Sequence, residues 1–140
     1  MRYITLERAR EIHRLTIDYS DGGAYEHFDL GRLDSVLENI QNDDYYPTLA
    51  DKLTHLFFCT CKFHCFADGN KRLAVTLCVE LLLCNGYRRA AEVFFPAMEY
   101  VTYQVAAGTI DKELLHRILS AFLEGRTDRA LQEDILKAIR

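Results

Sequence analysis

The chain has little of what irregular or exported proteins depend on. Only two prolines and seven glycines occur among its 140 residues, which argues against a loop-rich or all-β protein. The longest apolar stretch, residues 73–84, is interrupted by Thr76 and Glu80 and is too short to span a membrane. Residues 1–12 are charged and contain no apolar core of a signal peptide. We therefore expect a cytoplasmic protein that makes no membrane contact.

An excess of positive charge is also missing. The net charge of −4 argues against general nucleic-acid binding, because contacts with phosphates need a basic surface. The five cysteines are an odd number in a chain without export signals, which favours free thiols. With 49% apolar and 27% charged residues, the composition is that of one ordinary globular domain.

Apolar residues recur at helical spacing along most of the chain, which predicts an all-α fold. Residues 70–84 are apolar on nearly every side, as is typical of a buried central helix, and Asn85-Gly86 ends this stretch. Residues 87–96 are expected to form a connector with an extended piece at 92–95. The expected helices span residues 7–19, 30–40, 49–63, 70–84, 97–107 and 112–123, and a last one, capped by Thr127, carries Leu131, Ile135, Leu136 and Ile139 on one face.

The segment between the third and fourth expected helices carries the most chemical information. Lys71 and Arg72 add positive charge where the helix dipole is already positive, which indicates an anion at that helix start. Asp68 offers a carboxylate for Mg²⁺, a common companion of polyphosphates. His64 is suited to act as a general base near neutral pH. The segment reads His64-x-Phe66-x-Asp68-Gly69-Asn70-Lys71-Arg72 and suggests group transfer from a nucleotide to a nucleophile.

This segment resembles the Fic/Doc signature, His-x-Phe-x-(Asp/Glu)-(Gly/Ala)-Asn-(Gly/Lys)-Arg, at every defined position. Residues 1–5, 29–32, 85–86 and 106–108 are similar to the Doc branch as well. The likeness implies a helical bundle, possessing in some members a short β flap, in which Phe66 anchors the loop. It divides the chain into a Fic/Doc-like domain over residues 1–125 and an amphipathic helix within residues 126–140 that packs on that domain.

Two positions separate the activities of the family. Members that attach AMP to a hydroxyl usually have Gly after the Asn and a second Arg three residues beyond the first, whereas Lys71 and Val75 stand here. The resemblance to Doc implies an ATP-dependent kinase that phosphorylates a protein hydroxyl, with translation elongation factor Tu as a candidate target, and a toxin paired with a small antitoxin. It also implies a target-aligning flap over residues 22–28. In that scheme His64 is the base, Asp68 binds Mg²⁺, and Gly69, Asn70, Lys71 and Arg72 hold phosphates of ATP.

Two alternatives stay open. AMP transfer, or transfer of another nucleotide, is supported by the Asp68-Gly69-Asn70 core, which that branch shares. A binding module that has lost activity would keep the fold without the chemistry. The helix within residues 126–140 is a further candidate for an oligomer contact.

Several other patterns have structural explanations. Cys59, Cys61 and Cys65 lack zinc-ligand spacing and are expected to be buried core thiols. Residues 120–125 match the family's inhibitory motif, (Ser/Thr)-x-x-x-Glu-(Gly/Asn), but the Arg with which that Glu pairs is absent at Val75, so an ordinary helix end is expected. The other histidines are expected on the surface or behind the site: His13, His27, His55 and His116.

Overall fold

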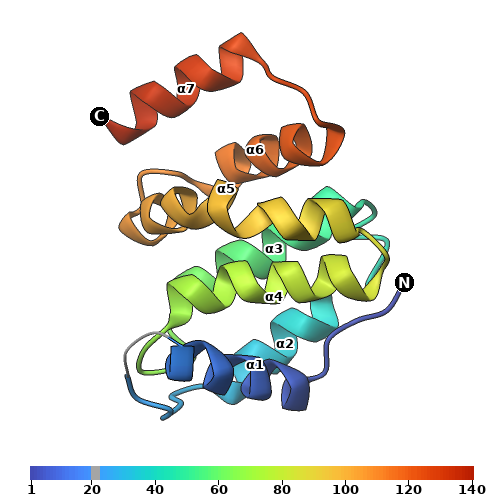
Figure 1. Ribbon diagram of the computed structural model, residues 1–140, viewed down its shortest axis with the longest axis vertical. Helices are drawn as coiled ribbons and strands as arrows, with labels where there is room; N and C mark the ends of the chain where they lie inside the picture. Colours follow the sequence, from blue (N-terminus) through green and yellow to red (C-terminus); the bar gives the residue numbers. More distant parts are fainter. Residues whose placement is uncertain (20–22) are drawn as a thin grey trace.

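A computed structural model describes residues 1–19 and 23–140 of the chain (Figure 1). Across these residues the polypeptide is helical and forms no strand, which confirms the predicted all-α fold. The helices are α1 (Leu6–Tyr19), α2 (Leu30–Asn39), α3 (Leu49–Lys62), α4 (Asn70–Cys84), α5 (Arg88–Ala107), α6 (Lys112–Glu124) and α7 (Arg129–Ile139).

Helix α4 is the centre of the bundle. It packs against α3, α5 and α1, and in Figure 1 it crosses the middle of the molecule between α5 above and α1 below. Leu73, Leu77 and Leu81 are fully buried along its length, because apolar residues occur on almost every side of this helix. The helix begins and ends where the sequence predicts, at Asn70 and Cys84.

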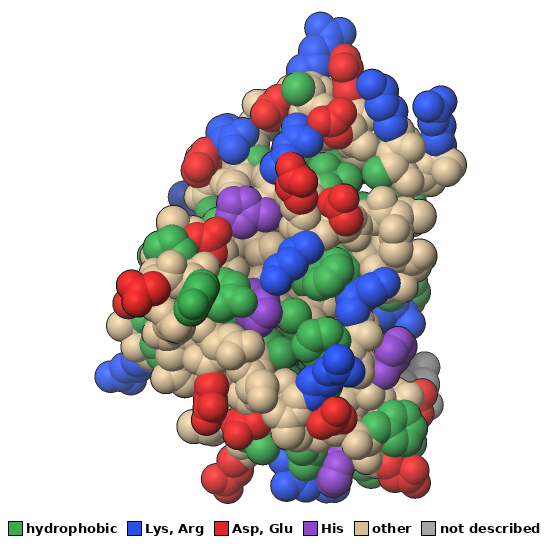
Figure 2. Space-filling view, turned by 180° about the vertical axis from the view of Figure 1, so that it is seen from behind, with side chains coloured by type: hydrophobic (Ala, Val, Ile, Leu, Met, Phe, Trp, Pro, Cys, Tyr) green, Lys and Arg blue, Asp and Glu red, His purple; other side chains and the backbone are tan. Residues whose placement is uncertain are grey.

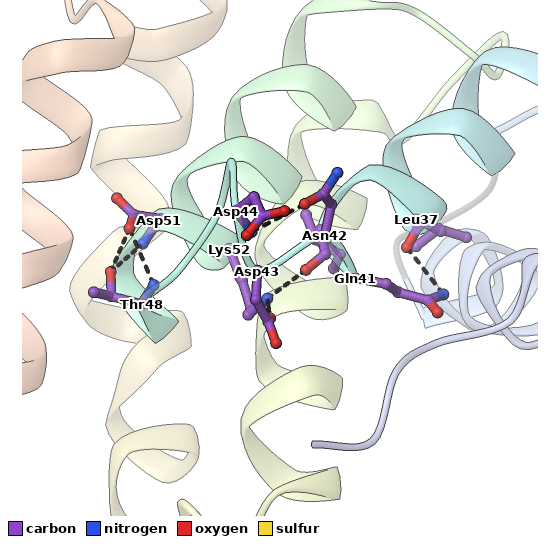
Figure 3. Close-up of polar contacts among 9 residues, drawn as sticks. Leu37, Gln41, Asn42, Asp43, Asp44, Thr48, Asp51 and Lys52 are labelled. Atoms are coloured by element: carbon purple, nitrogen blue, oxygen red, sulfur yellow. Dashed lines mark hydrogen bonds and ion pairs between the residues drawn. The ribbon is translucent and has the colours of Figure 1, made fainter.

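The connection from α2 to α3 is fixed by polar contacts (Figure 3). Thr48 and Asp51 form a capping box at the start of α3, in which each side chain accepts from the other residue's backbone N–H. Lys52 is only 3% exposed, and its ammonium donates to the carbonyl of Ile40 at 2.6 Å and to Asp43 at 2.7 Å. These bonds satisfy a carbonyl at the end of α2 that would otherwise lack a partner.

Helix α5 corrects the prediction of a connector over residues 87–96 with an extended piece at 92–95. The helix begins at Arg88 and continues through Pro96. Its N-terminal half is held by packing, since Phe94 is fully buried between the rings of Phe57 on α3 and Phe122 on α6. Tertiary burial therefore outweighs the local preference of proline to end a helix.

Helix α7 packs on α6 at the end of the molecule opposite α1 (Figure 1). Leu131 is buried, and Ile135 and Ile139 pack partly against the core. Two details of the prediction are wrong: Asp128 rather than Thr127 caps the helix, and Leu136 is 64% exposed. On the face shown in Figure 2, positive and negative side chains are interspersed. No helix in the described part of the chain has the length and apolar character needed to cross a bilayer.

Candidate functional site

The predicted motif forms the loop between α3 and α4. His64 is exposed and has a φ of 49°, and it is the only residue other than glycine with a positive φ among those described. This left-handed backbone is costly for a residue with a Cβ, so the surrounding contacts must hold it in place. The turn ends α3 and sends the chain across the start of α4.

Phe66 and Asn70 fasten this loop to the bundle. The Phe66 ring is 2% exposed, as expected for the anchor of the loop. The Asn70 side chain donates to the Phe66 carbonyl at 2.8 Å and accepts from the Phe66 N–H at 3.2 Å. Its amide is thus engaged in holding the loop, while the backbone N–H groups of the first turn of α4 have no partner within the helix. Phosphate binding by Asn70 stays a prediction.

An extended segment lies against the motif loop at the position predicted for a flap. His27 forms an antiparallel bridge with Phe66, and the Ala67 N–H donates to the carbonyl of Glu26 at 2.9 Å. The N–H of Phe28 donates to the carbonyl of Cys65 at 2.8 Å. Residues 26–28 therefore pair with the loop along one edge, whereas Gly22, which the predicted flap included, lies outside the described residues.

Asp68 and Gly69 occupy the end of the loop, close to α1. The Asp68 carboxylate accepts from the Ala24 N–H at 2.8 Å, which ties it to the extended segment. Gly69 precedes α4 with a φ of 80°, and a Cβ at this position would lie 3.0 Å from Cδ1 of Ile17. The loop is therefore packed closely on α1, and a side chain at this position would crowd Ile17.

His13 of α1, which was expected on the surface or behind the site, lies directly behind the motif loop. It is 1% exposed, its ring stacks on Phe66 with centroids 3.6 Å apart, and its Nε2 lies 2.7 Å from the Asp68 carbonyl oxygen. Burial lowers the pKa of His13 below its ordinary value, opposed in part by the bond to Asp68. The sequence contained a signal for the burial of His13. Residues 9, 12, 13, 16 and 17 recur at helical spacing and form the buried face of α1.

A pocket of about 220 Å³ lies beside the first turn of α4. Lys71 extends over the ring of Tyr103, with its ammonium 5.5 Å from the centroid, and the Arg72 guanidinium lies 5.6 Å from the centroid of Phe95. Val75 is 1% exposed and contributes to the lining. The lining residues are Gly69, Asn70, Lys71, Arg72 and Val75 from the motif side, and Phe95, Glu99, Thr102 and Tyr103 from α5.

The structure thus brings four of the six predicted site residues together around this pocket: Gly69, Asn70, Lys71 and Arg72. Asp68 precedes them directly, and His64 lies at the other end of the loop without lining the pocket. The wall from α5 could not be predicted, because residues 95–103 are far away in sequence and fall partly in the expected connector.

The cysteines near the motif are free thiols in the core. Cys59, Cys61 and Cys65 are buried, as predicted, and burial raises the pKa of the Cys65 thiol to about 11. A thiol with so high a pKa is a poor nucleophile at neutral pH. Cys78 is buried too, whereas Cys84 is exposed.

Residues 120–125 form an ordinary helix end, as predicted. Gly125 terminates α6 with a φ of 64°, and the Glu124 carboxylate accepts from the guanidinium of Arg126. The acidic residue of the supposed inhibitory motif is therefore paired with its own neighbour.

Replacing Gly69 with Ala should destabilise the protein by about 1–3 kcal/mol, the usual cost of a strained backbone position. Gly86→Ala is the matched control, since Gly86 has a φ of 83° but its Cβ would meet nothing within 4 Å. Both variants bear the backbone cost, and only Gly69→Ala adds crowding against Ile17. Thermal unfolding measures the two losses. Equal losses would contradict close packing of the loop on α1.

The comparison with known families agrees with this geometry. The model of the Fic/DOC family matches residues 3–82, which include the whole motif and most of α4. The chain therefore belongs to the Fic/DOC family. Members of this family are transferases that attach groups to proteins. No curated protein matches the chain.

Proposed function

We propose that this protein transfers the γ-phosphoryl group of ATP to a hydroxyl on a protein target. The observation that carries the proposal is the pair Lys71 and Val75. Lys71 brings a second cation to the first turn of α4, beside Arg72, where a small residue would leave room for the phosphates of an AMP donor. Val75 is buried in the pocket lining, where an AMP-transferring relative would place the Arg that holds the γ-phosphate.

The start of α4 has the properties of a phosphate site. Its first N–H groups point out of the helix without intrahelical partners, and the helix dipole is positive at this end. Gly69 precedes these groups and lines the pocket beside them. Lys71 and Arg72 are both exposed and lie at the pocket, so their charges are available to an anion.

His64 is the proposed general base. Its side chain is exposed at the start of the loop, where it can accept the proton of a target hydroxyl. The hydroxyl oxygen then forms a bond to the γ-phosphorus while the bond from that phosphorus to the β,γ-bridging oxygen breaks. ADP leaves with the electron pair of the broken bond, and the proton remains on His64. Arg72 and Lys71 stabilise the charge on the phosphates during the transfer.

Asp68 fits the predicted role of Mg²⁺ ligand. One carboxylate oxygen accepts from Ala24, and the other has no hydrogen-bond partner among the described residues. Those residues contain no cluster of three His, Cys, Asp or Glu side chains able to hold a metal. Mg²⁺ is commonly held by one or two carboxylates together with substrate phosphates and water, a role that a single Asp carboxylate can fill. When bound, the ion would neutralise phosphate charge.

The extended segment 24–28 is the proposed aligning surface for the target. One of its edges pairs with the motif loop, and a target strand could add to the other edge through backbone hydrogen bonds. We further propose that the target is a translation factor such as elongation factor Tu, and that the protein is a cytoplasmic toxin held by a small antitoxin. An oligomer contact through α7 is part of the same proposal.

The first experiment incubates the protein and a His64→Ala variant with Mg²⁺ and bacterial lysate, using ATP labelled at either the γ- or the α-phosphate. A band that depends on His64 and carries only the γ label is the expected result. The α label on that band would mean AMP transfer instead and would reject the use of Lys71 and Val75 as discriminators.

Absence of both labels, together with equal growth of cells expressing wild type and His64→Ala, would identify an inactive binding module. Slower growth with the wild type alone is expected if the protein is a toxin. Intact-mass analysis of the target provides an independent check, because added phosphate and added AMP differ greatly in mass.

A further inference from the structure

We propose that His13 is a positioning residue, which holds the motif loop so that Asp68 and the start of α4 keep their active arrangement. His13 lies on α1, more than fifty residues before the motif, and touches none of the groups proposed to react. The activity part of this inference depends on the proposed transferase function, whereas the structural part does not.

Two contacts connect His13 to the loop at separate points. Its ring is nearly parallel to that of Phe66, at an interplanar angle of 13° and a centroid distance of 3.6 Å. Its Nε2 lies 2.7 Å from the backbone oxygen of Asp68, two residues further on. A carbonyl oxygen only accepts, so Nε2 carries the proton and donates. The ring therefore fixes both the buried anchor of the loop and the backbone of the proposed Mg²⁺ ligand.

The loop is otherwise held from α4 and from the extended segment. Asn70 bonds both backbone groups of Phe66, and residues 26–28 pair with residues 65–67. His13 is the contact from the third side, that of α1. A Cβ on Gly69 would lie in ordinary contact with Nε2, at 3.5 Å, so the ring also borders the residue that precedes α4. Loss of the Nε2 bond would leave the Asp68 carbonyl without this partner in the protein.

The bond from Nε2 explains why a histidine suits this position better than another aromatic residue. His13 lines a polar pocket of about 280 Å³ between α1 and the extended segment, together with residues such as Arg14 and Tyr25. Nδ1 has no hydrogen-bond partner among the described residues. Phenylalanine could keep the stacking on Phe66, but it could not donate to the Asp68 carbonyl.

Two substitutions separate the contacts. His13→Phe keeps a ring for stacking but removes the donor, whereas His13→Gln keeps a donor at similar reach and removes the ring. Thr16→Val is the matched control on the same helix, because Thr16 is buried and its hydroxyl bonds only within α1, to Ile12. For each variant we would measure hydrogen exchange of the Phe66 and Ala67 amides, together with kcat and KM for ATP.

The expected result for His13→Phe is loop exchange at least about tenfold faster than in the wild type, a kcat lowered by about tenfold or more, and a nearly unchanged KM. His13→Gln should recover most of both losses, and Thr16→Val should resemble the wild type. Unchanged loop exchange and kcat in His13→Phe would reject the proposal. Equal losses in His13→Phe and His13→Gln, without selective opening of the loop, would also reject it and indicate a packing role alone.

Failure of the transferase proposal is distinguishable from failure of this one. A wild type without transfer activity would refute the function, while the loop exchange would still test His13. If His13→Phe does not fold, the ring nitrogen resonances of the wild type decide. A protected Nε2–H supports the proposal, and a proton on Nδ1 with bare Nε2 refutes it.

Discussion

Replacing Phe94 with Ala should lower the free energy of unfolding by about 3–5 kcal/mol, the usual cost of removing a buried aromatic ring. Phe94 is fully buried on α5, with Phe57 at a centroid distance of 6.3 Å and Phe122 at 5.4 Å, both in edge-on contact. The three rings join α3, α5 and α6. Truncation removes both aromatic contacts and leaves a cavity that only three helices moving together could close.

Denaturant unfolding measures this loss, and the adjacent Val93→Ala is the control. Val93 is 50% exposed on the same helix, so its truncation should change stability by no more than about 0.5 kcal/mol. A loss below about 1 kcal/mol for Phe94→Ala would contradict the packing of α5 described above. A change in the denaturant slope would show that the variant alters the unfolded or native ensemble as well.

Acidification from pH 6.5 to about 4 should cost about 3 kcal/mol through His55 alone, since one pKa unit corresponds to about 1.4 kcal/mol. His55 is 8% exposed, and burial together with the nearby charge of Lys112 lowers its pKa from 6.5 to about 4. The Lys112 ammonium donates to His55 Nδ1 at 2.9 Å, which requires a neutral ring. Cys59, Tyr46 and Asn39 provide the other polar contacts of the ring.

The direction of this change in stability follows from proton binding by the folded and unfolded protein. Below pH 6.5 the unfolded chain protonates His55 while the folded protein does not, so stability falls as the pH falls and levels off beneath about pH 4. His13, whose pKa is also lowered, adds to the loss in this range. Asp43 and Asp51 have lowered pKa values because of Lys52 and Thr48, respectively, and they extend the loss to lower pH.

Denaturant unfolding at a series of pH values tests this prediction with His55→Phe, which retains a ring against Tyr46. The variant should be less stable at pH 7 but should lose less stability than the wild type between pH 6.5 and 4. His27→Gln, at an exposed position, should keep the wild-type pH dependence. If the stability of His55→Phe depends on pH as steeply as that of the wild type, other groups cause the acid sensitivity.

The sequence was most informative where one helix or one loop decides the structure. The ends of α4 were predictable because Asn85-Gly86 ends the helix and an all-round apolar pattern precedes it. The motif residues were predictable because they are adjacent in the chain. Helix α5 was not, because Pro96 and the polar start of the helix imitate a connector, while the packing of Phe94 depends on distant partners.

The contacts of the site that the motif alone could not predict also depend on residues far away in the sequence. His13 and the α5 wall of the pocket lie far from the motif in sequence, and only the fold brings them to it. His55 was expected on the surface or behind the site, but it is buried and bonded to Lys112. Single-sequence patterns contain the periodicity of each helix, but they do not state which helices meet.

Pro96 removes one hydrogen bond from the backbone of α5. Having no N–H, it leaves the carbonyl of Glu92 without its helical partner. The turns on both sides of it are held by burial, through Phe94 before it and through Met98 and Val105 after it. Thr102 of the pocket wall is buried as well and bonds the carbonyl of Lys71, so the shape of the pocket is set by the same core that stabilises the fold.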